Sequence, residues 1–411
     1  MFRFGLGDET EANNGFIRIL RLQKLFLFFV STVCGLGASV AAEVNHSSPI
    51  KEAESHYSVA QVKRYNQQYC SDATDAQLDL TGVTLARASN IPLMYQGYNN
   101  LEGPVWYNGA LYYSNMGSQQ PDEDGFQLTN QSTIWKWVPG NEPQIWLQDT
   151  LAGTNGLALD SAERLVVTRQ LDGSISYIDW QSKKIQPLAT GFQGKRFNSP
   201  NDLTIAFDDM IYFTDPNWNV PSNIDGKMLQ GGGEPGSMQP GQRIYKVDSN
   251  GTVVATDVTE LVPELRDKPN GIALSLDQQH LIVGGLRGLW SFRLHNGKVS
   301  APEKLMATPI DGLGKDCSGN IYVTTTRKSS NRADEQYVVV LDKHYKEIGA
   351  LVVAGIHIVT NIAFGGVDNK TLFVTGLTVP MDGDKQRRCG QLPCMKAGIY
   401  TTRLNVQGFP Y

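Results

Sequence analysis

The feature that most constrains the fold is a unit that recurs six times along the chain: a polar residue, a short apolar strand, a turn and a second apolar strand. Its clearest copy is SPNDLTIAFDDMIYFTDP at residues 199–216, where the polar pair Asn201 and Asp202 precedes the alternating Leu203 and Ile205. Alternation at every second residue is the period of a β-strand with one buried face. The unit therefore predicts a hairpin whose first strand begins, unusually, with polar side chains.

Five further copies begin at Glu102, Asn155, Asn270, Asp311 and Asn361. Together with Asn201, these leading residues recur at intervals of about 50 residues, which is close to the length of a β-propeller blade. The stretches between the units also alternate around Gly, Asn and Asp turns, as the outer strands of four-stranded blades would. No segment shows a long helical period. We therefore expect an all-β fold, a six-bladed β-propeller.

The spacing of the units places the propeller at residues 91–411, after a short N-terminal extension at residues 43–90. Within the extension, LDLTGVTLARA at residues 78–88 alternates and could add a closing outer strand. The Gly- and Pro-rich stretch between the third and fourth units predicts a surface loop over one end of the barrel.

The first 42 residues differ from the rest in composition. Arg18, Arg21 and Lys24 precede the apolar run LFLFFVSTVCGLGASVAA at residues 25–42, which ends in small residues. This pattern is typical of a secretory signal peptide, so we expect residues 1–42 to be a leader and the protein to be secreted. The run is long enough for an uncleaved anchor as the alternative, which would leave the catalytic domain membrane-attached and extracytoplasmic.

Net charge and cysteine content limit which binding partners and which disulfide bonds can be expected. A formal net charge of -5 argues against nucleic-acid binding, which needs a basic surface. Four cysteines follow the leader, of which Cys389 and Cys394 could close a small loop. Cys70 and Cys317 could pair only if the fold brings them together. A CxxxxC spacing without a nearby histidine is poor for zinc.

The innermost strand of each propeller blade lines a central channel, so the six leading residues should converge on one axis. Carboxylate and amide oxygens without Cys or His are ligands for Ca²⁺, Mg²⁺ or Mn²⁺, and Ca²⁺ suits a loose ring of side chains best. Glu102 and Asp311 would balance the charge of one divalent cation. Asn-Gly and Asp-Gly are also common turns, but recurrence at one place in the repeat favours a site. We expect the far end of this water-filled channel to be closed by packed blades.

Three residues near the units are expected to have structural roles. Asp202 follows Asn201 along the strand, where successive side chains point in opposite directions, so it should bind backbone amides rather than a metal. Asp215 should cap a turn before Pro216. His357 is the one histidine expected near the channel, where packing or hydrogen bonding is more usual than proton transfer.

Six motifs, in this order over about residues 95–405, resemble the gluconolactonase / senescence marker protein (regucalcin) family: LEGPVW, SPNDL, IYFTDP, KPNGIALSLD, IDGLGKDCSGNIYV and TNIAFGGVDNKTLFVTG. Regucalcin-type members carry an arginine two residues before the Asn of the ND motif. The microbial gluconolactonase branch reads SPNDL as this chain does, with Ser199 at that position. The resemblance is therefore closer to the microbial branch.

The resemblance implies a six-bladed, calcium-dependent hydrolase that opens a lactone ester. It implies a metal held by Glu102, Asn201, Asn270 and Asp311, with Zn²⁺, Mg²⁺ or Mn²⁺ as possible replacements for Ca²⁺. It also implies that Asp311 acts as the catalytic base.

The resulting expectation is attack by water on a small-molecule lactone whose carbonyl is polarised by the metal. Asn155 and Asn201 would orient the substrate, and Trp218 could cover its ring. Related six-bladed propellers hydrolyse aryl esters or organophosphates at a similar calcium centre, which is one alternative. The other alternative is a secreted binding propeller without catalytic activity, in which the metal is purely structural.

Overall fold

The computed structural model describes residues 58–70, 77–88, 100–116, 119–122, 125–128, 131–150, 153–218, 238–327, 335–378, 381–382, 385–386, 388–389, 392–393 and 396–409. All of these belong to one compact unit, Ala53–Tyr411. The expected leader at residues 1–42 lies outside the described residues, as does Cys394. Within the described part, no helix is long and apolar enough to cross a membrane.

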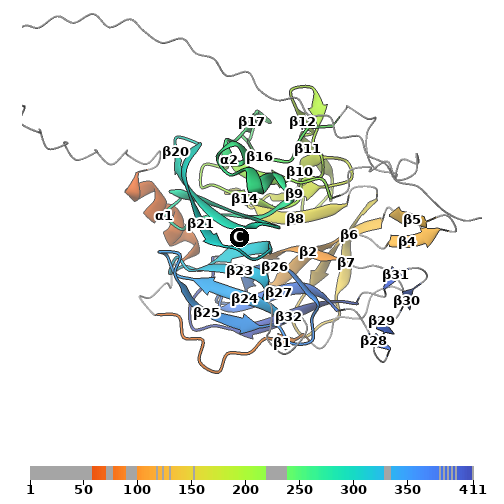
Figure 1. Cartoon of the computed structure of the whole chain (residues 1–411). Helices are drawn as coiled ribbons and strands as arrows, with labels where there is room; N and C mark the ends of the chain where they lie inside the picture. The colour runs from red at the N-terminus through yellow and green to blue at the C-terminus, as the bar shows by residue number, and fades with distance from the viewer. Residues whose placement is uncertain are drawn as a thin grey trace, which may run out of the picture. The chain divides into compact units, whose positions relative to one another are not determined.

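Six four-stranded antiparallel sheets dominate the described chain (Figure 1). The first three, with strands in spatial order, are β2 (Leu101–Tyr107), β3 (Ala110–Asn115), β6 (Gln131–Trp137) and β7 (Gln144–Thr150); β8 (Thr154–Leu159), β9 (Leu165–Arg169), β10 (Ser174–Ile178) and β11 (Ile185–Ala189); and β14 (Leu203–Ile205), β15 (Ile211–Asp215), β16 (Arg243–Val247) and β17 (Val253–Ala255).

The other three sheets follow the same plan. They are β18 (Pro269–Leu274), β19 (His280–Gly285), β20 (Gly288–His295) and β21 (Lys298–Met306); β22 (Ile310–Lys315), β23 (Ile321–Arg327), β24 (Glu335–Leu341) and β25 (Glu347–Val352); and β26 (Ile358–Gly365), β27 (Thr371–Thr378), β32 (Lys396–Arg403) and β1 (Ala86–Arg87).

The first strands of the six sheets pack against one another in a closed ring. Each of β2, β8, β14, β18, β22 and β26 contacts the corresponding strand of the next sheet, and β26 contacts β2. In Figure 1 the strand colours accordingly pass from orange through yellow and green to blue around the centre. The expected six-bladed β-propeller is confirmed.

The sixth sheet is completed by the N-terminal extension. Its outermost strand is β1, which pairs antiparallel with β32 so that Ala86 faces Thr401 and Arg87 faces Tyr400. The closing strand expected within residues 78–88 is therefore present. Because one sheet contains strands from both ends of the described chain, the ring is held shut by backbone hydrogen bonds.

Apolar side chains from adjacent sheets interlock between the blades. Ala158 and Val166 of the second sheet, for example, pack against Leu203, Phe213 and Tyr245 of the third. Each large apolar side chain buried in this way contributes roughly 1.5–3 kcal/mol relative to an exposed one. The cores therefore lie between the sheets and leave the axis to the polar ends of the inner strands.

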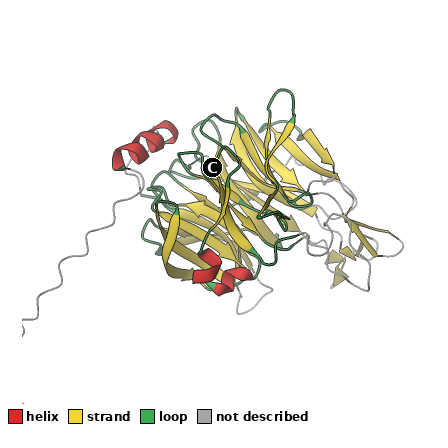
Figure 2. Cartoon of the chain, turned by 90° about the horizontal axis from the view of Figure 1, so that it is seen from above, coloured by secondary structure: helices red, strands yellow, loops and turns green. Residues whose placement is uncertain are grey.

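Small hairpins and helices complete the described chain. The hairpins pair β4 (Gln119–Asp122) with β5 (Gly125–Leu128), β12 (Gly191–Phe192) with β13 (Lys195–Arg196), β28 (Met381–Asp382) with β29 (Lys385–Gln386), and β30 (Arg388–Cys389) with β31 (Leu392–Pro393). The helices are α1 (Val59–Tyr69), α2 (Val258–Leu261) and the 3₁₀ turn Pro263–Arg266. Figure 2 shows them at the periphery of the sheets.

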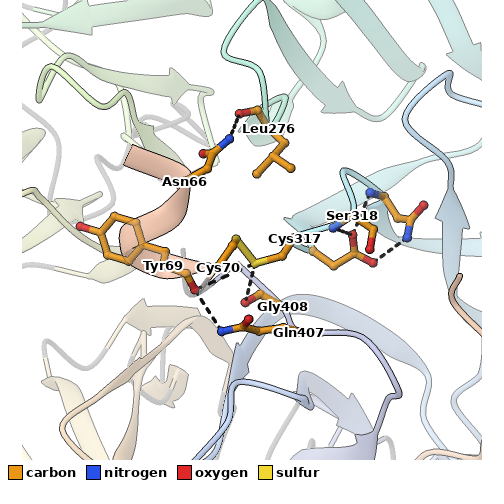
Figure 3. Close-up of a disulfide and its surroundings, with 10 residues drawn as sticks. Asn66, Tyr69, Cys70, Leu276, Cys317, Ser318, Gln407 and Gly408 are labelled. Atoms are coloured by element: carbon orange, nitrogen blue, oxygen red, sulfur yellow. Dashed lines mark hydrogen bonds between the residues drawn. A yellow bond between two sulfur atoms is a disulfide. The ribbon is translucent and has the colours of Figure 1, made fainter. Parts of the chain in front are cut away.

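Helix α1, which the sequence pattern did not predict, is fixed to the fourth, fifth and sixth sheets (Figure 3). Its end is joined to the fifth sheet by a disulfide between Cys70 and Cys317, with 5.6 Å between their Cα atoms. Asn66 Nδ2 donates to the Leu276 carbonyl oxygen at 3.0 Å. The fold thus brings together the pair of cysteines whose bonding the sequence left conditional.

Candidate active site

The pairing at the start of each inner strand is irregular. Register shifts lie between Glu102 and Val105, Thr154 and Leu157, Pro269 and Ile272, Ile310 and Leu313, and Val359 and Ile362. In the third sheet, the Thr214 carbonyl oxygen accepts from Asn201 N, and Thr214 N donates to the Asp202 carbonyl oxygen. Asn201 and Asp202 therefore both lie opposite Thr214, as in a β-bulge. Such bulges change the direction of side chains and are common beside functional sites.

The glycine that follows the leading residue allows neighbouring inner strands to approach closely. In four blades a Cβ on this glycine would lie 2.2–2.9 Å from the leading residue of the next blade: Gly103 against Asn155, Gly156 against Asn201, Gly271 against Asp311 and Gly312 against Asn361. These glycines lie within strands rather than in hairpin turns. The turn interpretation of the Asn-Gly and Asp-Gly pairs is therefore wrong, and close packing around the axis explains the glycine.

Buried hydroxyl groups fasten the leading segments of adjacent blades to one another. Each donates to a backbone carbonyl oxygen of the next blade: Ser114 to Asn155 at 2.7 Å, Thr168 to Asn201 at 2.6 Å, Thr324 to Thr360 at 3.0 Å and Thr360 to Leu101 at 2.6 Å. Because these donors are themselves packed inside strands, the positions of the leading residues are set before any ligand binds.

Four of the six leading residues interact directly at the axis. Glu102 accepts a hydrogen bond from Asn361, and Asp311 accepts one from Asn270. Burial, and then the Asp311 and Asp202 carboxylates, raise the pKa of Glu102 well above its usual value. Burial and the charge of Asp202 raise the pKa of Asp311 to about 8. The fold therefore concentrates negative charge from blades far apart in the sequence.

Asp202 is a third carboxylate in this group. It accepts hydrogen bonds from the backbone N–H groups of Leu203, at 2.9 Å, and Ile272, as expected for an anchor of backbone amides. It also lies 3.5 Å from Asn361 Nδ2, and burial raises its pKa to about 7. The expectation that it points away from the converging residues is wrong because the bulge disturbs the alternation. The sequence contained one sign that Asp202 is different. It occupies the position after the leading residue, where four other units have glycine.

Asn155 and Asn201 are buried parts of the same ring. Asn155 is 1% exposed, and its Nδ2 donates to Met116 Sδ at 3.4 Å. Its Oδ1 has no hydrogen-bond partner within the described residues. A buried acceptor left unpaired costs about 1–3 kcal/mol, so this oxygen is suited to a ligand, an ion or water.

A narrow channel of about 50 Å³ continues from the ring along the axis, with Asp202 and Asn361 at one end and Lys315 and Phe409 at the other. Lys315 is 4% exposed, its Nζ donates to the Leu274 carbonyl oxygen at 3.1 Å, and burial lowers its pKa to about 8. Phe409 packs below Lys315 and against Tyr69 of α1. Helix α1 and the C-terminal segment, rather than the blades alone, therefore close the far end.

The segment leading into Asn201 is held by Asp215. This carboxylate accepts from Asn198 N at 2.9 Å and from Ser199 N at 2.8 Å, and burial raises its pKa to about 7. Asp215 thus caps the turn before Asn201 rather than one beside Pro216. The side chain of His357 is exposed, just before β26 begins.

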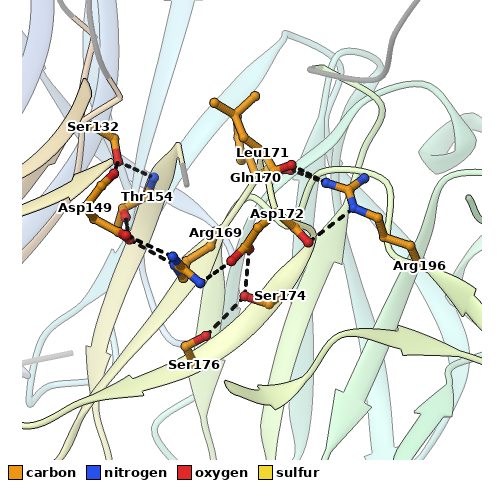
Figure 4. Close-up of polar contacts among 10 residues, drawn as sticks. All are labelled: Ser132, Asp149, Thr154, Arg169, Gln170, Leu171, Asp172, Ser174, Ser176 and Arg196. Atoms are coloured by element: carbon orange, nitrogen blue, oxygen red, sulfur yellow. Dashed lines mark hydrogen bonds and ion pairs between the residues drawn. The ribbon is translucent and has the colours of Figure 1, made fainter. Parts of the chain in front are cut away.

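A buried ionic network braces the start of β8, where Asn155 lies (Figure 4). Arg169 donates to both oxygens of Asp149, at 2.8 and 2.9 Å, and pairs with Asp172. Asp149 also accepts from Thr154 Oγ1 at 2.8 Å. Arg169, to which the sequence pattern gave no role, therefore ties the first sheet to the second beside the ring.

The side chains at the axis can bind a divalent cation only if amide oxygens are among its ligands. Among the described residues, no three His, Cys, Asp or Glu side chains are grouped closely enough to hold a metal ion. The carboxylates of Glu102 and Asp311 with the amides of Asn201 and Asn270 would offer an all-oxygen set with two negative charges, which is the ligand chemistry that Ca²⁺ prefers. A cation there would also offset the repulsion that raises both carboxyl pKa values.

Comparison with known proteins gives one family match and two curated relatives. The family model described as SMP-30/Gluconolactonase/LRE-like region matches residues 101–378. The chain is 22% identical over 251 residues to a gluconolactonase from Zymomonas mobilis subsp. mobilis, a match covering 54% of this chain and 64% of that protein, less than two thirds of its length. It is 26% identical over 294 residues to pentonolactonase XacC of Haloferax volcanii, covering 69% and 82% of the two chains.

Solved structures show the same fold at low identity. A gluconolactonase from Xanthomonas campestris aligns with a TM-score of 0.56 and 21% identity, over 79% of this chain and 91% of that one. The calcium-binding protein regucalcin from Agrobacterium tumefaciens aligns with a TM-score of 0.51 and 15% identity, over 79% and 97% of the two chains.

Proposed function

Because the chain belongs to the SMP-30/gluconolactonase/LRE-like family, we propose that it is a hydrolase that opens the ester bond of a small-molecule lactone, as a gluconolactonase does. The observation that carries this proposal is the meeting of the buried Glu102 and the half-buried Asp311 at the axis, each hydrogen-bonded to an asparagine of a neighbouring blade. Burying two carboxylates side by side is costly, and functional sites are where such costs are usually found.

A divalent cation, Ca²⁺ first and Zn²⁺, Mg²⁺ or Mn²⁺ as alternatives, is part of the proposal. Glu102, Asn201, Asn270 and Asp311 would hold it. When bound, it would polarise the lactone carbonyl and stabilise the developing oxyanion. Asn361 and the bulged backbone keep Glu102 directed at the axis, so the ligands need little rearrangement.

Asp311 is proposed as the general base. It is half-buried, so water can reach it, and its raised pKa makes the ionised carboxylate a stronger base than an exposed one. The proton of the attacking water would pass to this carboxylate as the new C–O bond forms, and would leave with the opened hydroxy acid. Asn155 and Asn201 would hydrogen-bond the substrate, for which the unpaired Asn155 Oδ1 is available.

We also propose that the protein acts outside the cytoplasm, as a secreted enzyme or one tethered by an uncleaved segment at residues 1–42. Supporting this is the Cys70–Cys317 disulfide, because such bonds persist in oxidising compartments. The division into an extension at residues 43–90 and a catalytic domain at residues 91–411 belongs to the same proposal.

The test is hydrolysis of D-glucono-1,5-lactone by chelator-treated protein titrated with Ca²⁺. Turnover should return with Ca²⁺, and Asp311→Asn should lose about 100-fold or more in kcat/KM, the scale set by removing a principal electrostatic group. Asp208→Asn, an exposed carboxylate at the far turn of the third blade, is the matched control and should retain activity.

Parallel assays decide between the functions. Faster Ca²⁺-dependent cleavage of phenyl acetate or a phosphotriester would assign the site to ester or organophosphate hydrolysis instead. Ca²⁺ binding without turnover of any of the three substrates would identify a binding propeller and reject the proposal.

A further inference from the structure

A large pocket lies between helix α1 and the fourth and fifth blades. Its volume is about 790 Å³, within the range of small-molecule sites. We call it the helix pocket, and its walls are α1 and the turns that follow β18, β22 and β24. Figure 3 shows five of the residues that line it: Asn66, Cys70, Leu276, Cys317 and Ser318.

The helix pocket lies at the opposite ends of the inner strands from the candidate active site. Asn270 is near the start of β18 and Ser275 follows its end, while Asp311 is near the start of β22 and Cys317 lies beyond its end. At roughly 3.3 Å per residue, the members of each pair are about 15–20 Å apart along the strand. Helix α1 also precedes residues 101–378, so one wall of the pocket is outside the stretch that the family model matches.

Helix α1 is held in place as the first wall. The Cys70–Cys317 disulfide joins its end to the turn after β22. Asn66 Nδ2 donates to the Leu276 carbonyl oxygen at 3.0 Å in the turn after β18. Because these contacts reach two different blades, the helix is fixed across the pocket before any ligand binds.

The turn between β24 and β25 is a second fixed wall. Asp342 Oδ1 accepts from His344 N at 2.8 Å and from Lys346 N at 2.9 Å, which closes the turn. A Cβ added to Gly319 would lie 3.3 Å from Lys343 Cβ, so this turn packs closely on the turn after β22. The pocket therefore has walls of defined shape.

One side of the helix pocket is aromatic and apolar. The rings of Tyr345 and His280 meet edge to face, with their centres 5.8 Å apart. Burial lowers the pKa of His280, so its ring is largely uncharged at neutral pH. The φ of Tyr345 is +63°, and residues other than glycine are held in this region where the surroundings fix a side chain for a particular use. With Val62 and Leu276, these rings would remove an aromatic ligand from water.

The charged groups of the helix pocket are mainly cationic. Lys63 of α1 and Lys343 of the turn after β24 line it, and neither makes an ion pair within the described residues. Among the described lining residues the one carboxylate is Asp277, which already accepts from Ser275 Oγ at 2.6 Å and from Gln279 N at 3.0 Å. Two unpaired ammonium groups from different walls favour an anionic ligand.

We propose that the helix pocket binds a small aromatic carboxylate, with its ring against Tyr345 and His280 and its carboxylate paired with Lys63 and Lys343. This is a second binding site, remote from the axis, and it does not depend on the proposed lactone hydrolysis.

The experiment is calorimetric titration of the whole protein with 2-naphthoate in the presence of a chelator. Two control ligands separate the parts of the recognition: 2-naphthamide has the same rings without the charge, and butyrate has the charge without the rings. We expect one saturable site for 2-naphthoate and affinities at least about tenfold weaker for both controls.

Two pairs of variants place the ligand in the helix pocket. Lys63→Met and Lys343→Met keep the aliphatic stems and should each weaken 2-naphthoate binding about threefold, and about tenfold when combined. Arg64→Met and Lys346→Met are the matched controls, because these exposed cations adjoin the two lysines but do not line the pocket. The combined control should bind as wild type does.

Three results would overturn the proposal. The first is a double lysine variant that binds 2-naphthoate as tightly as wild type or no more weakly than the double control. The second is a loss of affinity in Asp311→Asn instead, which would place the ligand at the axis. The third is no saturable binding together with a dimer in sedimentation that Lys343→Met dissociates, which would assign the pocket to a second copy of the chain.

Discussion

Asn361 of the sixth blade hydrogen-bonds Glu102 of the first, so the two ends of the propeller meet at one buried carboxylate. Closure of the ring and formation of the candidate site are therefore one event. The same amide lies 3.5 Å from Asp202, which places a single side chain between carboxylates of the first and third blades.

Replacing Asn361 should weaken metal binding. Asn361→Ala removes the hydrogen bond that favours the ionised form of Glu102, so the pKa of Glu102 should rise further and fewer molecules should present a charged ligand. We expect the calorimetric Kd for Ca²⁺ at neutral pH to increase about tenfold. Asn141→Ala, an exposed asparagine in an outer turn, is the control. An unchanged Kd in Asn361→Ala would contradict this role.

The stability of the metal-free protein should fall as pH rises. The carboxyls of Asp202 and Asp311 have pKa values of about 7 and about 8 in the folded protein, above the value of about 4 expected in the unfolded chain. At pH values between the unfolded and the folded pKa, the folded protein binds more protons than the unfolded chain does. Ionisation with rising pH therefore favours unfolding. Thermal unfolding with chelator should show Tm decreasing from pH 5 to pH 8.

Calcium should reverse this trend, since it binds the ionised carboxylates. The gain in Tm on adding Ca²⁺ should therefore increase from pH 5 to pH 8. Carboxyls whose pKa is lowered, such as Asp179 and Asp248, lose their stabilising effect only at more acidic pH and do not disturb this window. A Tm in chelator that does not fall between pH 6.5 and pH 8, above the range in which the lowered pKa of His280 matters, would show that the carboxyls of Asp202 and Asp311 do not titrate as stated.

The glycine after Asn270 should tolerate no side chain. A Cβ on Gly271 would lie 2.2 Å from the Asp311 carbonyl oxygen, so Gly271→Ala must separate the fourth and fifth blades. We expect a loss of at least about 2 kcal/mol in the free energy of unfolding, together with weaker Ca²⁺ binding. Gly241→Ala adds a Cβ that meets nothing within 4 Å and serves as the control in urea denaturation. Equal stabilities of the two variants would refute the close-packing explanation.

Removing the Arg169 guanidinium should destabilise the start of β8. Arg169→Met leaves Asp149, which is 3% exposed, without its ion-pair partner, and such losses cost about 3 kcal/mol or more. Arg169→Lys restores the charge without the paired N–H groups and should recover part of the stability. Urea unfolding of the three proteins measures this order. If both variants were as stable as wild type, the network would have no bracing role.

The repeat of blades could be predicted from the sequence because every blade has one inner strand at the axis. Each of these strands follows a polar residue and shows the two-residue alternation of a β-strand. That regularity placed Glu102, Asn270 and Asp311 on different inner strands, and the fold brings these three side chains together. It could not place Asp202, because a bulge changes the direction of a side chain without changing the apolar pattern.

Features that depend on long-range packing were beyond the sequence pattern. Cys70 and Cys317 are 247 positions apart, and no spacing rule pairs cysteines at that distance. Helix α1 has only 11 residues and few apolar ones, so its periodicity is weak until it packs on the propeller. The hydrogen bonds by which Gln242 joins the segment after β15 to the segment before β18 also depend on packing, which alternation does not encode.

The pairing of β1 with β32 also bears on how the protein is made. All the other strands of the six sheets lie between β1 and β32 in the chain, so these two strands can pair only after every other strand has been made. Until then the edge of β32 offers unpaired backbone groups to other chains, which makes the nascent protein prone to aggregation. The sixth sheet can therefore be completed only after the strands of the other five exist, and its outer edge depends on a strand of two residues.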